Sequence, residues 1–340
     1  MREQPDSVLR GVMKAIFVLT FVLSSAFFAV GQKAGVLAPS LTVSLPLVQG
    51  GFNHMSVDAA RQRLFVAAPT NKTLEVVDIK SGKLLQSLDG ERPAAALYAP
   101  EFNQLYVSRG QGVSIYDGET LNLIASVDLQ TNPDEMHYDP RAKELYVGCM
   151  GADKTGIAII AIPEGKLLAK ISLPGKPQGF VVEQNGSRIF ANLPDQKMVA
   201  VIDRKKHLVL QPWPLQDVQG NTPIALDEAH HRLFVGARRP ATLLVLDTST
   251  GKQVAAIGID GDTDDIFYDP ANRRIYVSCG EGFVDVIQQV DANHYRSLGR
   301  IVTISGARTS TLSAQLNKFF LGVPRRADQP AEIRVFDAAK

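Results

Sequence analysis

Two acidic pairs, Asp134–Glu135 and Asp264–Asp265, stand out among the residues whose types could support chemistry. Adjacent carboxylates repel one another unless a cation, a proton or an arginine lies between them. Hard cations such as Ca²⁺ take oxygen ligands of this kind, so all four residues are candidate calcium ligands. Neither pair lies in a dense Asp-x-Asp-x-Asp loop. A solvated acidic rim with Arg308 as its counter-charge is therefore the simpler interpretation.

One histidine, His54, could take part in acid–base chemistry. Together with Arg308 and Glu135 it offers the general base, electrophile and general acid that a hydrolase needs. Nothing in the spacing of the three residues is diagnostic, and the alternative is a hydrogen-bonded structural histidine. The other histidines form no constellation in the sequence; they are His137, His207, His230, His231 and His294.

A set of arginines could bind an anion. A guanidinium recognises carboxylate and phosphate through a planar fork of N–H donors, so this set favours an anionic ligand or an acidic partner surface. Ordinary solubilising charge on loops is the simpler interpretation. The set comprises Arg109, Arg238, Arg239, Arg325 and Arg326, and Arg308 belongs with it.

The elements that must position these residues follow from an internal repeat. An apolar pair that contains an aromatic residue recurs seven times, at spacings of 40 to 44 residues. A period of this length is typical of a propeller or a solenoid. We call the first residue of each copy its landmark; the landmarks are Leu64, Leu105, Leu145, Ile189, Leu233, Ile275 and Phe319.

Each repeat has the content of a four-stranded unit. A turn beginning with Asp precedes the landmark in several copies, and a third strand such as LEVVD (74–78) follows it. A Gly-Lys corner then leads to a fourth strand such as KLLQSL (83–88). Because the segments lack helical spacing of apolar residues, the sequence predicts an all-β, seven-bladed β-propeller. The expected blade cores lie near 52–92, 93–132, 133–176, 177–220, 221–263, 264–306 and 307–340.

The last repeat stops after its third strand, IRVFD (333–337), and lacks a fourth. The segment LTVSLPLV (41–48) precedes the first repeat and has no other partner. We expect 41–48 to supply the outer strand of the last blade. This pairing would close the ring and cover strand edges that would otherwise be exposed.

The two cysteines, Cys149 and Cys279, occupy the same position in the third and sixth repeats, four residues after the landmark. In a ring of seven blades they would lie about 20 Å apart, given the spacing of strands in a sheet. A disulfide needs Cα atoms within about 7 Å of each other. The sequence therefore predicts two unpaired thiols that serve as small apolar core residues.

The chain from residue 32 onward resembles the YVTN/YncE-like seven-bladed propellers. The resemblance is carried by the strands LYVS (105–108), LYVG (145–148) and IYVS (275–278), and by the corners VVDIKSGK and VLDTSTGK. It implies the propeller fold, and it leaves function open between DNA-associated and cell-surface or periplasmic roles. Residues 32–340 carry 33 basic and 33 acidic residues, a balance that disfavours nucleic acid.

Propellers usually bind ligands on the face where the innermost strands begin, an expectation that rests on fold analogy. The residues ten and eleven positions before each landmark should enter the central channel there. The loops between second and third strands, which carry the arginine set, lie on the same face. The predicted ligand-binding residues are therefore Asn53, His54, Asp134, Glu135, Asp264, Asp265, Arg308, Arg109, Arg238 and Arg239.

The first 31 residues have the form of a secretory signal. An apolar run at 15–30 follows Arg10 and Lys14, and Ala29-Val30-Gly31 offers a small-x-small cleavage site. The run is shorter than the roughly 20 residues of a spanning helix, and an uncleaved anchor is the alternative. We expect cleavage to leave one propeller domain, 32–340, without a membrane span, in the periplasm or outside the cell.

The function expected from the sequence is that of an exported, monomeric, non-enzymatic binding scaffold. Its partner would be a protein or a small molecule on the channel face, because loops on a rigid scaffold commonly carry such function. The alternative is a channel-mouth enzyme, a lactonase-like hydrolase with or without a divalent cation. DNA binding by the arginine loops is a weaker alternative.

Overall fold

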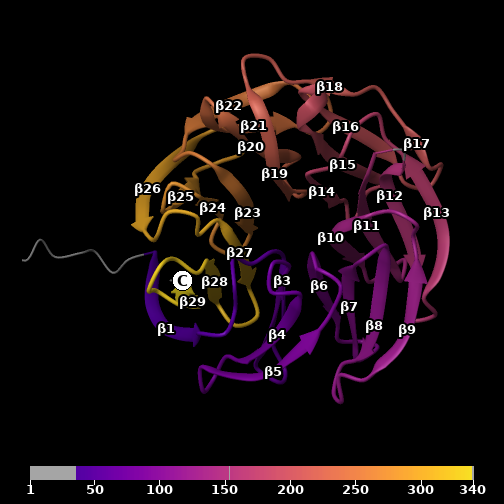
Figure 1. The fold of residues 1–340 in the computed structure, drawn as a ribbon. Helices are drawn as coiled ribbons and strands as arrows, with labels where there is room; N and C mark the ends of the chain where they lie inside the picture. Colours follow the sequence, from indigo (N-terminus) through magenta and orange to yellow (C-terminus); the bar gives the residue numbers. More distant parts are fainter. Residues whose placement is uncertain (1–35, 153, 339–340) are drawn as a thin grey trace, which may run out of the picture. The chain divides into compact units, whose positions relative to one another are not determined.

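Each landmark lies in the second strand of a four-stranded antiparallel sheet, and seven such sheets form a ring in the described residues (Figure 1). The computed structural model describes residues 36–152 and 154–338. This confirms the predicted seven-bladed β-propeller. The proposed signal at 1–31 lies outside the described residues. No helix in the described part of the chain is long and apolar enough to cross a membrane.

In each blade the first strand of the repeat lies nearest the channel, and the second, third and fourth strands follow outward to the rim. The first strands are β2 (Met55–Asp58), β6 (Ala95–Ala99), β10 (Pro133–Asp139), β14 (Gly179–Val182), β19 (Gln219–Asp227), β23 (Thr263–Asp269) and β27 (Thr309–Ser313). The second strands are β3 (Arg63–Ala68), β7 (Gln104–Arg109), β11 (Glu144–Gly151), β15 (Arg188–Leu193), β20 (Arg232–Arg239), β24 (Arg274–Cys279) and β28 (Lys318–Val323).

The outer half of each blade follows the same order. The third strands are β4 (Thr73–Asp78), β8 (Gly112–Asp117), β12 (Lys154–Ala161), β16 (Met198–Asp203), β21 (Ala241–Asp247), β25 (Phe283–Gln289) and β29 (Ala331–Ala338). The fourth strands are β5 (Lys83–Asp89), β9 (Leu123–Asp128), β13 (Lys166–Ser172), β17 (Leu208–Val209) with β18 (Trp213–Pro214), β22 (Gln253–Gly258), β26 (Tyr295–Val302) and β1 (Leu37–Leu45). A 3₁₀ turn, η1 (Pro194–Gln196), joins β15 to β16.

Burial explains why the landmark strands are mostly apolar. Neighbouring blades cover both faces of an inner strand, so all six residues of β3 are buried, whereas β5 at the rim is almost wholly exposed. The aromatic side chain of each landmark pair, such as Phe65 or Tyr146, is fully buried between blades. Burial of such a side chain contributes about 2 to 3 kcal/mol.

The recurring aspartate at the end of the first strand builds the turn to the second. In blade 3, Asp139 Oδ1 accepts hydrogen bonds from the backbone N–H groups of Arg141 and Ala142, at 2.9 and 3.2 Å. Lys143 then adopts a positive φ of 55° before β11 begins. The Asp-Pro dipeptide in the sequence therefore marks an Asx turn of this kind.

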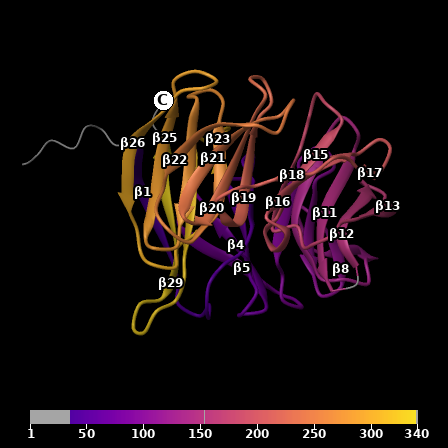
Figure 2. The same ribbon diagram turned by 90° about the horizontal axis from the view of Figure 1, so that it is seen from above.

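Ring closure is confirmed, although its strand begins and ends earlier than expected. Strand β1 pairs with β29 in antiparallel register from Leu37 with Ala338 to Leu45 with Ala331, and the two segments lie side by side in both views (Figures 1 and 2). The predicted range 41–48 is therefore shifted. Pro46 has no N–H to donate and the chain turns there.

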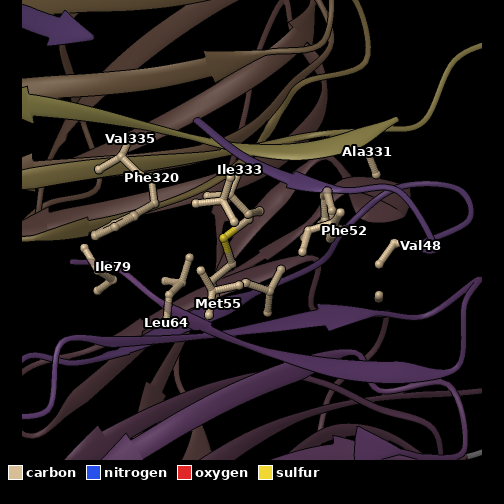
Figure 3. Close-up of a cluster of buried hydrophobic side chains, with 14 residues drawn as sticks. Val48, Phe52, Met55, Leu64, Ile79, Phe320, Ala331, Ile333 and Val335 are labelled. Atoms are coloured by element: carbon tan, nitrogen blue, oxygen red, sulfur yellow. The ribbon is translucent and has the colours of Figure 1, made fainter. Parts of the chain in front are cut away.

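The closed junction has its own core. Side chains from blade 1, including Met55, Leu64 and Ile79, pack against Phe320 and Ile333 of blade 7 (Figure 3). Because residues from both ends of the described chain contribute to this cluster, closure buries apolar surface as well as satisfying backbone hydrogen bonds.

Blade 4 departs from the regular pattern at its rim. Its fourth strand is broken into two short pieces, β17 and β18, which both pair with β16. Pro212 and Pro214 lie in this segment, and proline cannot donate to a strand ladder.

The cysteines behave as predicted. Cys149 and Cys279 are buried and unpaired, on β11 and β24.

Candidate functional site

The first strands bring most of the predicted residues to two adjoining hollows in the channel. The mouth cavity, about 480 Å³, is lined by Asn53, Asp134, Thr222, Arg238 and Arg308, among others. The deep cavity, about 350 Å³, is lined further along the strands by Met55, Glu135, His137, Ile224, Asp265 and Thr311, among others. His54, Gln178 and Asp264 line both cavities, so they lie at the junction.

His54 reaches from blade 1 towards two other blades. Its Nε2 lies 3.9 Å from Asp134 Oδ1 on β10, and its Nδ1 lies 3.9 Å from Asp265 Oδ1 on β23. Within the described part of the chain, no hydrogen bond to this imidazole is formed, because both distances exceed hydrogen-bond range. The ring therefore lies between two carboxyl groups without a directional contact to either.

The charge of His54 follows from its surroundings. Burial alone would lower the pKa of this imidazole, but the carboxylates of Glu135 and Asp134, followed by those of Asp265 and Asp264, raise it to about 9. His54 is therefore a cation at neutral pH. Its side chain is 23% exposed, so the interaction is only partly screened by solvent.

Asp265 is the second carboxyl group beside the His54 ring. Its Oδ2 accepts a hydrogen bond from the backbone N–H of Ser310 at 2.6 Å. Burial, together with the nearby Asp264, raises the pKa of this carboxyl to about 8 against the opposing effect of His54. Burial likewise raises the pKa of Asp134. The channel thus holds carboxyl groups that ionise less readily than usual.

Glu135 behaves in the opposite way because it has strong hydrogen-bond partners. Its Oε1 lies 2.9 Å from His137 Nε2, and its Oε2 accepts the backbone N–H of Phe180 at 3.1 Å. Burial would raise the pKa of Glu135, but the interactions with His137 and then His54 lower it overall. Glu135 is therefore ionised at neutral pH.

The sequence showed no constellation around His137, whereas the structure places it beside Glu135. His137 lines the deep cavity, and its ring packs edge-on against Phe180 with centroids 4.6 Å apart. Alternation along a strand was the signal available in the sequence, since residues two apart, such as Glu135 and His137, point to the same side.

Four charged side chains form a network at the mouth. Arg308 Nη1 donates to Asp262 Oδ2 at 2.6 Å, and Arg308 Nε lies 3.1 Å from Asp264 Oδ2. Arg238 Nη2 donates to Asp264 Oδ1 at 2.5 Å. Arg308 thus acts as a counter-charge for the acidic rim. Asp262, which the sequence analysis missed, completes the network from the loop before β23.

The remaining arginines lie away from both cavities. Arg109 donates to Ser114 Oγ at 2.7 Å and lies over the ring of Tyr116. Arg325 donates to the carbonyl of Pro46 at 2.8 Å and so fastens the loop after β1. Neither Arg239 nor Arg326 lines a described cavity. The structure therefore does not gather the predicted basic set into one anion site.

Metal binding has no support from side-chain geometry. Among residues 36–152 and 154–338, no group of three or more His, Cys, Asp or Glu side chains converges in an arrangement that could hold a metal ion. Asp264 is instead bound by two arginines. Calcium at Asp134, Glu135, Asp264 and Asp265 stays a prediction.

Comparison with known proteins gives the same fold. No protein-family model matches the chain. It is 32% identical over 98 residues to the uncharacterized protein YncE of Salmonella typhi, and 31% identical over 98 residues to the YncE of Salmonella typhimurium. Each match covers 28% of this chain, and the chain spans only 28% of the length of these relatives.

Two solved structures are similar in fold over most of the chain. A chain of Kuenenia stuttgartiensis hydrazine synthase matches with a TM-score of 0.71 and 16% identity, over 80% of this chain and 92% of its own. A chain of a mitotic checkpoint complex matches with a TM-score of 0.75 and 13% identity, over 98% of this chain and 99% of its own. Such low identities support the fold alone. The chain is a seven-bladed β-propeller, and a stretch of 98 residues in it is similar to YncE.

Proposed function

We propose that this protein is an exported, non-enzymatic propeller that binds a compact ligand in its axial channel. The proposal rests mainly on one observation: three blades converge on the junction of two cavities, where His54 lies 3.9 Å from both Asp134 and Asp265. Polar groups that converge in a hollow of a rigid scaffold are typical of a ligand site. Export rests on the apolar run at 15–30 and its cleavage motif.

The polar groups that are not already paired indicate the chemistry of the ligand. Arg238 and Arg308 are bound to Asp262 and Asp264, and the positive charge of His54 is outnumbered by the four carboxyl groups that face it, so the site offers little net positive charge to an anion. Within the described residues, Asp134 accepts one hydrogen bond, a long one of 3.5 Å from Asn53. We therefore expect a neutral or positively charged ligand that donates hydrogen bonds, such as a small amine or a polyol.

The protonation states disfavour the hydrolase alternative. A general base must be unprotonated at the working pH, whereas His54 is charged at neutral pH. A general acid must carry a proton, whereas Glu135 is ionised. These states are the reverse of the roles that the sequence suggested.

Binding is tested by thermal melts of residues 32–340 against a panel of small amines, polyols and carboxylates. A ligand that binds only the native state raises the melting temperature. We expect amines or polyols to do so, Asp134→Asn to remove most of the shift, and Arg109→Gln, away from the channel, to leave it unchanged. Shifts caused only by carboxylates, or equal shifts in Asp134→Asn, would contradict the proposal.

Export is tested separately by expressing the full chain and determining the N-terminus of the product. We expect a protein that begins at Gln32 and is found outside the cytoplasm. A product that retains residues 15–30, or one that stays in the cytoplasm, would reject cleavage or export respectively.

A further inference from the structure

The position of His54 at the junction of the two cavities gives it a role beyond lining the site. Its backbone is fixed, because the His54 carbonyl accepts the N–H of Ala96 at 3.4 Å and the residue bridges to Ala95 of blade 2. Its ring, in contrast, makes no hydrogen bond with the described residues. The ring can therefore turn without breaking any directional contact, on a backbone that stays in place.

What holds the ring is the charge around it. Four carboxylates face it: Asp134 and Glu135 from blade 3, and Asp264 and Asp265 from blade 6. Asn53 and Ala95, which lie beside it in blades 1 and 2, are uncharged. Attraction between opposite charges about 4 Å apart is substantial in a partly buried site, and it disappears when the imidazole loses its proton.

We propose that His54 forms a proton-controlled electrostatic contact across the channel, which we call the tie. In its charged form His54 joins blade 1 to blades 3 and 6 and separates the mouth cavity from the deep cavity. Loss of the proton releases the ring and leaves the facing carboxylates to repel one another. The claim that the tie controls ligand access rests on the proposed function, whereas the tie itself does not.

The charge balance predicts where the release occurs. The pKa of His54 is raised to about 9, after burial is opposed by Glu135 and its neighbours, and burial raises that of Asp265 to about 8. Asp265 ionises first, so its attraction to the charged His54 is greatest between about pH 8 and pH 9, and loss of the His54 proton above about pH 9 leaves only repulsion among the carboxylates. The tie is therefore closed at pH 7, where the ionised Glu135 attracts His54, and through about pH 8.5, and it opens above about pH 9.

The test uses NMR of residues 32–340, with hydrogen exchange at a reporter amide. The Ser310 N–H donates to Asp265 and is buried, so its protection reports whether the tie is closed. We expect its protection factor, corrected for intrinsic exchange, to fall at least tenfold between pH 8.5 and pH 10, a range in which Asp265 is already ionised and His54 loses its charge. The fall in Ser310 protection should follow the titration of the His54 ring. The protection factor of the Val235 amide on β20 should not change.

Variants separate charge from packing. His54→Asn and His54→Gln cannot be charged, and we expect low protection of Ser310 at both pH values. His54→Arg stays charged, and protection should stay high at both. Asp134→Asn should shift the His54 titration and the loss of protection together to lower pH. The tie would be overturned by a His54 titration midpoint near 6.5. It would also be overturned if the protection of the Ser310 amide did not respond to pH or to these substitutions.

Ligand access is measured with whichever amine or polyol raises the melting temperature. If the tie controls access, its association rate should increase at least tenfold in His54→Asn. An unchanged rate alongside the expected exchange data would overturn the access step but keep the tie. Failure to find any binding compound would reject the proposed function, while the exchange data still decide on the tie.

Discussion

His137 Nε2 lies 2.9 Å from Glu135 Oε1, within one strand and facing the deep cavity. This contact keeps Glu135 ionised in a buried position, because a hydrogen bond to the charged form favours it. The same ionised carboxylate is the strongest of the four that raise the pKa of His54. One local pair therefore controls a charge on a different blade.

The first prediction tests that link. Glu135→Gln keeps an acceptor for the Phe180 N–H but removes the charge, so the pKa of His54 should fall towards its ordinary value. The free energy of unfolding should fall by about 1 kcal/mol, as for the loss of one charge-assisted hydrogen bond. The His54 midpoint is measured by NMR titration, and a midpoint equal to that of the wild type would contradict the link.

The second prediction concerns stability against pH. The folded-state pKa values of His54 and Asp265 are both raised, to about 9 and about 8, so the folded state binds more protons than the unfolded state. Stability then falls as the pH rises. The contribution of Asp265 is lost between about pH 4 and pH 8, and that of His54 between about pH 6.5 and pH 9.

Thermal melts from pH 5 to pH 10 measure this effect. Asp265→Asn keeps an oxygen for the Ser310 N–H without a charge that can ionise, so its melting temperature should decline less and exceed that of the wild type at pH 9. A gain of 1 kcal/mol corresponds to about 2 °C in a domain of this size. The exposed Asp328→Asn serves as the control, and an identical decline in both variants would refute the assignment.

The third prediction tests ring closure. Val43 on β1 is 1% exposed within the junction core, so Val43→Asp would bury an unpaired charge and should cost about 4 kcal/mol. Thr42→Asp adds the same charge one residue away on the exposed face and should cost less than about 0.5 kcal/mol. Urea unfolding measures both, and similar costs would show that β1 is not part of the core.

The fourth prediction concerns the mouth network. Arg308→Gln leaves Asp262 and Asp264 with one arginine, Arg238, so the channel becomes more negative and the His54 midpoint should rise. Because Arg308 is 39% exposed, the loss of stability should be under about 1 kcal/mol. Adding Asp262→Asn should return the His54 midpoint towards that of the wild type. If neither variant changes this midpoint, the network does not contribute to the electrostatic potential at His54.

The fifth prediction concerns the thiols. Burial raises the pKa of Cys149 to about 11 and also raises that of Cys279, so little reactive thiolate forms. A thiol reagent at pH 8 should label neither cysteine in the native protein and both after unfolding in guanidinium chloride. Labelling of the native protein at wild-type stability would show that one of them is accessible.

The sequence by itself determined the propeller, its blade number and its closure. These follow from local periodicity: the apolar landmark pairs recur because every second strand is buried on both faces, and the turns carry their own Asp and Gly signals. The residues entering the channel could also be counted from the landmarks, because strand length is nearly constant. His54, Asp134 and Asp265 were located in this way.

Only the tertiary structure decided which of those residues interact. Asp262 and Arg238 come together through two different blades, and His137 gains its role from the cavity it faces. Arg109 shares a face with Arg308, yet it packs against Tyr116 at the edge of its own blade. Side-chain pairing across a ring depends on distances between blades, and no pattern along one repeat encodes those distances.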